Sequence, residues 1–547
     1  MAVKGRLNLN NLVTLSLFLV TITTAPLFAF DPVNVPRFSL LVIFGMLIGF
    51  QIYLNRKTLR FNQHNLIILL LLIFIIFIII SMLASQMPWP ERIYGVEGRN
   101  LGSLTYFLLV FVLLGTTLSE IKSIGPKLVS ILNFTGIFNA IYGLIQMLGL
   151  DPFDWINPYS PVFGFFGNPN FFASFIGIAS SGAINKVLDV KTKAIHKLGW
   201  TLIIFLYILV ITGSKSQQGI LVLISVSVVS LGFWFKTHAK YSKYLVGYTF
   251  VIGLGFIAGL LDILQKAPWP SFLYKQSVTF RGDYWQAGTH MALENPITGV
   301  GLDGFRDNYR STLTFERAAR LGAGEAVDSA HNIFIDLAAG GGIFLLFAYL
   351  LILLLALVKV LSQFKTLTEF DATYTVLVGA WVGYLLQSVI SINQIGLAIW
   401  GWCLTGFLIA DYSKIEENAK KPFNKFKIRD KILFLIILFI AIGVVRPLFL
   451  NDIEYRAAVK SGDITRIENV IREFPQQVGK YIYIAQLFES NGFSDRSIII
   501  AREAVKVNPR NYEAWQALLS MSKSTEIEKE NARVMLKQLN PNLQTAN

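Results

Sequence analysis

The chain has 547 residues, of which 54% are apolar and 15% are charged, and its formal net charge at pH 7 is +14. Soluble domains carry nearer a quarter charged residues, so this composition excludes a soluble globule and indicates a polytopic membrane protein. A single cysteine, Cys403, excludes an internal disulfide and a zinc site built on paired cysteines.

Long apolar runs along the chain predict the membrane-spanning helices. A bilayer core of about 30 Å takes roughly 17 to 25 apolar residues of helix. Thirteen such runs occur, at 9–30, 38–54, 66–83, 101–118, 128–150, 171–188, 198–212, 220–235, 244–261, 333–358, 374–391, 395–410 and 432–449. The expected fold is therefore an all-α polytopic membrane protein with 12–13 transmembrane helices, nine within residues 1–261 and four within 333–450.

Basic residues in the connecting loops predict the orientation, because cytoplasmic loops retain Lys and Arg. With the N-terminus inside, the inside loops hold clusters such as Arg56, Lys57 and Arg60, and residues 411–431 alone hold seven basic side chains. The short loops on the other side hold only Arg37, Arg92, Arg99 and Lys215.

Two long polar segments depart from this pattern of short connections. Residues 262–332 form a loop between the ninth and tenth spans, and residues 451–547 form a tail; by parity both are extracytoplasmic. The tail has Ala504, Pro509 and Trp515 at positions typical of a 34-residue tetratricopeptide-like repeat. Such repeats bind a protein partner or pack on a neighbouring domain, and the sequence leaves both open.

Charged side chains are almost absent from the predicted spans, where Asp336 and Arg446 are the exceptions. Ion-coupled transporters need ionisable groups at this depth. Their scarcity argues against a transporter without excluding a carrier of apolar or zwitterionic cargo. The functional polar groups are therefore expected in the outer loops.

Two residues of the long loop stand out. Arg281 lies in TFRGDYW, where a guanidinium suits bidentate binding of phosphate, although an Arg–carboxylate pair that only folds the loop would have the same composition. His331 opens HNIFIDLAAGGG, where the loop re-enters the membrane. An imidazole at such a boundary can act as a general base, or it can cap the following helix.

Three shorter outer segments carry further candidates for substrate binding. Lys215, in TGSKSQQG, precedes a helix N-terminus, which suits a phosphate, and Arg99, in YGVEGRNLGSL, has a similar setting. Asn168 and Asn170, in GFFGNPNFF, offer amides that suit sugar hydroxyls, although Asn-Pro-Asn is equally a turn and a helix start.

The segment GVGLDG at residues 299–304 fits the dinucleotide-binding fingerprint but lacks a surrounding βαβ unit, so we interpret it as a glycine turn. The sequence contains no Walker A motif and no GxSxG nucleophile elbow. The two outer histidines, His290 and His331, have no second His or Cys close by. No cofactor is therefore expected and neither histidine belongs to a recognisable zinc motif, while a metal site built from scattered carboxylates stays open.

Taken together, these segments resemble the bacterial O-antigen ligase and polymerase superfamily. The specific part is RGDYWQAGTHMALENPITGVGLDGF followed by HNIFIDLAAGGGIFLLFAYL, while GFFGNPNFFASF and YGVEGRNLGSLTYFL are also similar. The resemblance covers roughly residues 90–410. The tail resembles the C-terminal extensions of some members, including protein O-oligosaccharyltransferases.

The resemblance implies transfer of a glycan from undecaprenyl diphosphate to an acceptor, on the outer face of the bacterial cytoplasmic (inner) membrane. It implies that His331 deprotonates the acceptor hydroxyl and that Arg281 binds the diphosphate leaving group. Lys215 stands at a second diphosphate position that is commonly Arg in the family, and it supplies charge without the bidentate fork. The further substrate-binding residues that it implies are Arg99, Asn168, Asn170 and Asn332.

The leading hypothesis is therefore a metal-independent glycosyltransferase of the O-antigen ligase or O-oligosaccharyltransferase type, acting on a lipid or protein acceptor. The alternatives are a polymerase that uses the same carrier, and a non-enzymatic flippase or exporter of the lipid-linked glycan. The expected partners are the donor lipid, the acceptor, membrane lipids and a protein bound by the tail, with no nucleic acid.

Overall fold

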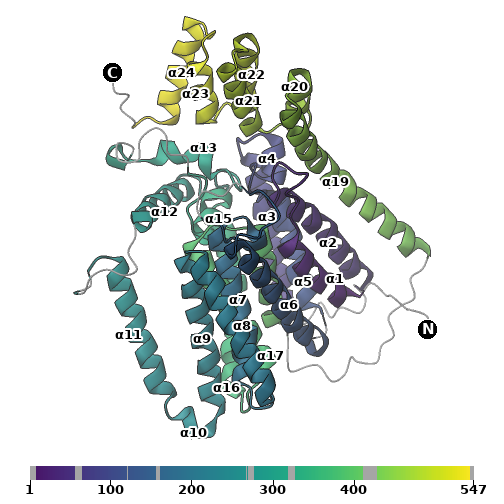
Figure 1. The fold of residues 1–547 in the computed structure, drawn as a ribbon, viewed down its shortest axis with the longest axis vertical. Coiled ribbons are helices and arrows are strands. Elements are labelled where there is room, and N and C mark those ends of the chain that lie inside the picture. The colour runs from purple at the N-terminus through teal and green to yellow at the C-terminus, as the bar shows by residue number, and fades with distance from the viewer. Residues whose placement is uncertain are drawn as a thin grey trace.

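The computed structural model describes residues 8–55, 65–119, 121–155, 160–266, 268, 276–317, 327–410 and 428–542. Throughout these ranges the regular structure is helical and contains no strand (Figure 1). Ten of the described helices are long and apolar enough to cross a membrane, and three shorter apolar helices accompany them. The chain is thus an all-α polytopic membrane protein, and each predicted run overlaps one of these helices.

The helices follow the apolar runs closely. The membrane bundle contains α1 (Leu9–Ile22), α2 (Asn34–Asn55), α3 (Asn65–Ala84), α5 (Ser103–Thr117), α6 (Ile121–Met147), α7 (Pro169–Leu188), α8 (Ala194–Gly213), α9 (Gln217–Thr237), α11 (Leu245–Ile263), α16 (Ile343–Thr366), α17 (Ala372–Ile390), α18 (Ile395–Ile409) and the first part of α19 (Ile428–Ser461). Shorter or polar helices connect or cap it: α4 (Trp89–Tyr94), α10 (Ala239–Ser242), α12 (Gln276–Glu294), α13 (Phe305–Tyr309) and α15 (Ile333–Gly341).

Small residues let the central helices of the bundle approach closely. A Cβ on Gly219 of α9 would lie 2.5 Å from the Cβ of Ala173 in α7. A Cβ on Gly379 of α17 would lie 2.6 Å from Oγ of Ser181, also in α7. Close packing of this kind holds membrane helices together, because lipid supplies no hydrophobic drive for helix association.

The tenth predicted run, 333–358, is two helices rather than one. α15 ends at Gly341, the next residue Gly342 has a φ of +85°, and α16 begins directly after it. The three glycines at 340–342 belong to an apolar sequence, but glycine also permits the left-handed turn that separates the helices. The predicted bounds were therefore wrong: α16 is the candidate span, and α15 is a short helix at one end of it.

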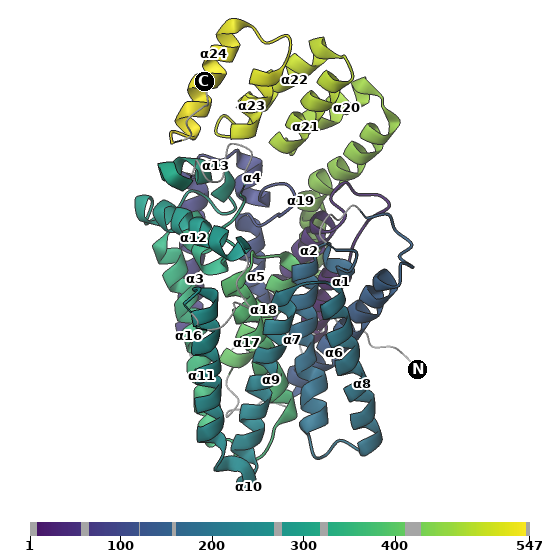
Figure 2. The ribbon, with the colours of Figure 1, turned by 60° about the vertical axis from the view of Figure 1, so that its left-hand side comes forward.

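The two ends of the bundle differ. The cap end, as we call it, carries α4, α12, α13 and the C-terminal helices (Figures 1 and 2). The opposite end carries α10 and the turn between α7 and α8, which contain Lys191, Lys193 and Lys240. The described residues between α11 and α15 (264–266, 268, 276–317 and 327–332) extend over the cap end, and we call them the cap loop.

The last helix of the bundle continues into the C-terminal domain without a break. α19 is 34 residues long and includes Pro447, so the expected boundary between residues 450 and 451 falls inside a helix. Antiparallel helices follow it (Figure 2): α20 (Ile464–Arg472), α21 (Val478–Ser490), α22 (Ser494–Val507), α23 (Tyr512–Ser520) and α24 (Glu526–Leu539). Their tetratricopeptide-like nature stays a prediction.

Polar contacts join the C-terminal domain to the cap loop. Asp307 accepts hydrogen bonds from the side-chain amides of Asn508 (2.7 Å) and Asn511 (3.1 Å). Glu513 forms an ion pair of 2.8 Å with Arg310. The cap loop is thereby held between the bundle and the C-terminal helices.

Candidate functional site

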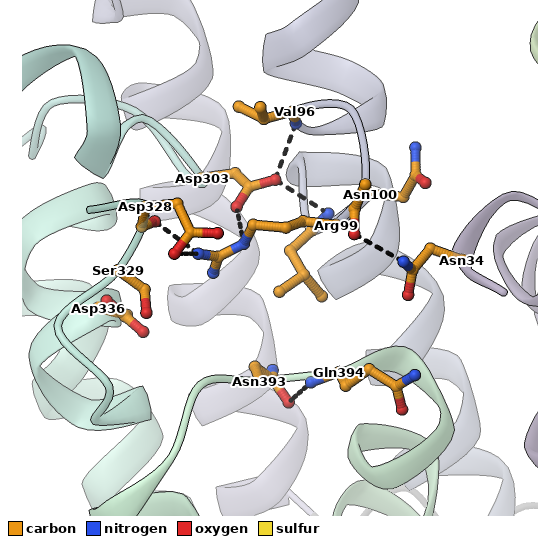
Figure 3. A network of polar contacts seen from close by, with 12 residues as sticks. Asn34, Val96, Arg99, Asn100, Asp303, Asp328, Ser329, Asp336, Asn393 and Gln394 are labelled. Carbon is orange, nitrogen blue, oxygen red and sulfur yellow. Dashed lines mark hydrogen bonds and ion pairs between the residues drawn. The ribbon is translucent and has the colours of Figure 1, made fainter. Parts of the chain in front are cut away.

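A buried polar network joins three segments of the chain (Figure 3). Arg99 lies between α4 and α5, and its Nε is 2.9 Å from Oδ1 of Asp303 in the cap loop. Its Nη1 donates a hydrogen bond to the carbonyl oxygen of Asp328, shortly before α15. The side chains of Arg99 and Asp303 are only 10% and 0% exposed, so solvent screens this ion pair little.

Asp303 also organises the loop that carries Arg99. Its Oδ2 accepts hydrogen bonds from the backbone N–H groups of Val96 (2.8 Å) and Leu101 (3.3 Å). Burial raises the pKa of Asp303, and the Arg99 guanidinium together with these N–H groups opposes the rise. A buried carboxylate needs such partners, so the network fixes the α4–α5 loop against the cap loop.

The glycine turn predicted at residues 299–304 is seated on the end of α15. The backbone N–H of Gly301 donates a hydrogen bond of 2.9 Å to the carbonyl oxygen of Gly340. Gly299 has a φ of +61°, and a Cβ there would lie 2.3 Å from the carbonyl carbon of Gly340. Glycine is therefore required both for the backbone conformation and for the close approach to α15.

A Gly299→Ala substitution should lower the free energy of unfolding by about 1–3 kcal/mol more than Gly98→Ala does. Gly98 also has a positive φ, +81°, but a Cβ there meets nothing within 4 Å. Comparing the two variants therefore separates the cost of the clash with α15 from the cost of placing alanine at a positive φ. Denaturant titration of both variants in detergent micelles measures the difference, and equal losses would contradict the seating of this turn.

His331 precedes α15 in a strained backbone conformation. Its φ is +53°, which is uncommon for a residue with a side chain. Ser329 Oγ accepts a hydrogen bond of 3.1 Å from the backbone N–H of His331, and Asn332 caps α15 by accepting from the N–H groups of Phe334 and Ile335. Strain of this kind concentrates where surrounding structure fixes a functional side chain.

The imidazole of His331 is neutral at neutral pH. Burial, together with the positive charges of Arg281 and Arg99, lowers the pKa of His331 to about 4, although Asp328 acts in the opposite direction. A neutral imidazole has one nitrogen lone pair that can accept a proton. Its ring lies 5.7 Å, between centroids, from the ring of Tyr284 on α12.

Arg281 supplies a cation close to this imidazole. It lies one helical turn before Tyr284 on α12, so the two side chains share a face of that helix. Within the described ranges no hydrogen bond or ion pair joins Arg281 to another side chain, whereas Arg317 of the cap loop pairs with Asp283 at 3.1 Å. Burial lowers the pKa of Arg281, but a guanidinium remains charged at neutral pH. Arg281 is thus suited to hold an anion.

The remaining residues that the sequence singled out form a second group. Lys215 is exposed in the turn between α8 and α9, with a φ of +59°. Asn168 caps α7 by accepting from the N–H of Asn170, whose Oδ1 accepts a hydrogen bond of 2.7 Å from Ser216. As far as the structure describes the chain, no hydrogen bond or ion pair connects these residues to the network around Arg99.

Arg99 and Asn332 have structural partners that the sequence did not reveal. Burial acts against the charge of Arg99, but neighbouring carboxylates raise its pKa overall. This guanidinium is already paired with Asp303, and direct contact between Arg99 and a substrate stays a prediction. The Asn332 side-chain oxygen is likewise engaged, as a helix cap. Asp303 and Asp328 were missed, and the near balance of acidic and basic residues in the loop was their only sequence signal.

Residues 200–350 match the sequence model of the O-antigen ligase family. The matched segment includes Lys215, Arg281 and His331, but it stops short of Arg99 and of the wider resemblance over residues 90–410. The match supports a membrane glycosyltransferase-like role, because this family is generally enzymatic. A comparison with curated proteins gave no match.

Proposed function

We propose that the protein is a membrane glycosyltransferase that moves a glycan from undecaprenyl diphosphate to an acceptor hydroxyl. The observation that carries the proposal is a neutral imidazole, His331, close to an unpaired guanidinium, Arg281, within the segment that matches the O-antigen ligase family. A base and an anion-binding group near each other are what displacement of a diphosphate by a hydroxyl requires.

In the proposed reaction, His331 accepts the proton of the acceptor hydroxyl while the hydroxyl oxygen bonds to the anomeric carbon of the donor sugar. The bond from that carbon to the diphosphate oxygen breaks, and Arg281 stabilises the charge left on the diphosphate. Direct displacement inverts the anomeric centre. A bound diphosphate also offsets the positive charge of Arg281, which helps to lower the pKa of His331, so the imidazole becomes a stronger base as the donor binds.

The proposed orientation places the cap end outside the cytoplasmic membrane of a bacterium. The lysines at the opposite end support it, because cytoplasmic loops retain basic residues. Lys215 is then the second proposed contact for the diphosphate. The C-terminal domain would face the acceptor, and we propose a tetratricopeptide-like role for it in binding a protein acceptor or partner.

The decisive experiment uses full-length protein in nanodiscs, undecaprenyl diphosphate carrying a labelled oligosaccharide, a membrane extract with competent acceptors, and EDTA. Label that moves to a new lipid or protein supports a metal-independent ligase or oligosaccharyltransferase, and mass spectrometry then identifies the acceptor. Growth of the chain on the carrier would instead indicate a polymerase. Label that stays on its original carrier would overturn the proposal and favour a flippase.

The pH dependence of transfer tests the protonation state of His331. An ordinary histidine is about nine-tenths protonated at pH 5.5, whereas a pKa of about 4 keeps His331 neutral there. We expect kcat/KM to be retained down to pH 5.5 and lost only as the pH falls towards 4. An Arg281→Gln variant should move the inflection upward and Asp328→Asn downward. Burial raises the pKa of Asp336 to about 7, so its own titration would fall within the measured pH range. Each pH profile is therefore measured in an Asp336→Asn background. A midpoint near pH 6.5 in that background would contradict the assignment.

A further inference from the structure

A pocket of about 350 Å³ lies where the membrane bundle, the cap loop and the C-terminal domain meet. Its walls come from α4 and the residues after it, from residues 303–307, and from α21 and α23 with the residues before them. The volume is within the range of small-molecule sites. Neither His331 nor Arg281 lines this pocket, so it is distinct from the proposed reaction centre. We call it the interdomain pocket.

Carboxyl groups outnumber basic groups in the lining. Arg306 is the only basic side chain among the lining residues, against Glu91, Glu97, Asp303, Asp307 and Glu513. The structure provides partners for three of these five acids. Asp303 pairs with Arg99, Asp307 accepts hydrogen bonds from two asparagine amides, and Glu513 pairs with Arg310.

Glu91 and Glu97 have no such hydrogen-bond or ion-pair partner among the described residues, although the positive charges of Lys480 and Arg306 act on Glu97 and that of Arg306 acts on Glu91. Glu91 is only 4% exposed, and no described residue forms a hydrogen bond or ion pair with its side chain. Oε1 of Glu97 is buried and also has no hydrogen-bond partner. Burial raises the pKa of Glu97 to about 7, and burial with neighbouring carboxylates raises the pKa of Glu91 well above its usual range. Buried carboxyls of this kind are neutralised either by a proton or by a cation.

Uncharged hydrogen-bonding side chains complete the lining and indicate the rest of the ligand. Gln477, Gln486, Gln516 and Tyr483 offer both donors and acceptors, which suits a ligand with several hydroxyl groups. No group of three His, Cys, Asp or Glu suited to a metal ion occurs in the described part of the chain. The cation that matches this lining is therefore an organic ammonium rather than a metal ion.

We propose that the interdomain pocket binds a saccharide with a free amine, its ammonium group bonded to Glu91 and Glu97 and its hydroxyls to the surrounding carboxamides. Hydrogen bonds between an ammonium and a carboxylate are the stronger kind, so they supply the selectivity. The pocket would give the protein a carbohydrate site separate from the one where transfer occurs. Asp303 lies in the wall of this pocket and pairs with Arg99, which places the two sites next to each other.

Isothermal titration calorimetry on full-length protein in nanodiscs tests the proposal, with glucosamine as the probe and N-acetylglucosamine, glucose and lysine as comparisons. Glucosamine should bind about tenfold or more tightly than N-acetylglucosamine, which keeps the ring and loses the charge. Equal affinities of these two sugars would overturn ammonium recognition. Lysine that binds as tightly as glucosamine would overturn the saccharide assignment.

Variants then locate the site. Glu97→Gln and Glu91→Gln should each weaken glucosamine binding about tenfold or more, whereas Glu473→Gln, an exposed acid of the C-terminal domain outside the pocket, should leave it unchanged. Unchanged binding in both pocket variants would place the ligand elsewhere and overturn the proposal. Calorimetry does not depend on transfer, so an active enzyme that fails to bind glucosamine refutes only the pocket, and an inactive one that binds it refutes only the proposed reaction.

Discussion

Replacing His331 with alanine is expected to lower the rate of glycan transfer by about 10²–10⁴-fold, the usual contribution of a positioned general base. The neutral imidazole is the proton acceptor in the proposed reaction, and the positive charges of Arg281 and Arg99 help to keep it neutral. Affinity for the undecaprenyl diphosphate donor should change little, because Arg281 remains in place. Single-turnover rates and donor binding, measured on the same nanodisc preparation, separate the two effects.

His290→Ala is the matched control for this variant. His290 also belongs to the cap loop, but it is exposed, with Nδ1 3.3 Å from Glu294 on the same helix. Its removal should leave the transfer rate within about twofold of wild type, as an exposed pair of this kind contributes little. Transfer by the His331→Ala protein at more than half the wild-type rate would exclude His331 as the base.

Replacing Arg281 with glutamine should lower transfer by about 10²–10³-fold, the range found when a donor that stabilises developing negative charge is removed. Donor affinity should fall as well, because the guanidinium meets the diphosphate before and during the reaction. The transfer rate and donor affinity of Arg281→Lys should lie between those of wild type and Arg281→Gln, since an ammonium keeps the charge and loses the planar fork. Titration of donor lipid in single turnovers gives the rate and the affinity together.

Arg317→Gln is the matched control for Arg281→Gln, because it removes a different arginine of the cap loop. Arg317 pairs with Asp283 on α12, so its removal should lower the thermal stability of the cap loop while donor affinity is retained. If Arg317→Gln and Arg281→Gln lower donor affinity equally, the assignment of the diphosphate site to Arg281 fails.

The sequence predicted the helices well and their ends less well, for a physical reason. Apolar length is what the bilayer selects, so every predicted run overlaps an apolar helix. Hydropathy does not report backbone conformation, however. The glycines at 340–342 count as apolar residues of one run, although they separate α15 from α16. Hydropathy also does not show whether a helix continues beyond the membrane. The polar residues after 450 continue α19, so the predicted boundary falls inside that helix.

The sequence could single out candidate residues whose own surroundings are unusual, but not residues whose importance depends on a partner far along the chain. An isolated His at a membrane re-entry point and an Arg among aromatics were singled out from their own surroundings, and their catalytic roles stay predictions. Arg99 was interpreted as a substrate ligand because nothing local shows that Asp303, 204 residues further along the chain, takes up its charge. Carboxylates in a near-neutral loop look alike until the fold brings each one to its partner.

The unbroken course of α19 has a consequence for how the C-terminal domain can vary. A helix advances 1.5 Å and turns about 100° with each residue, and α19 keeps this phase for 34 residues. Deleting one residue from it would swing Glu513 away from Arg310 by more than a quarter of a turn. The shape of the interdomain pocket thus depends on the number of residues in a helix that contributes nothing to its lining.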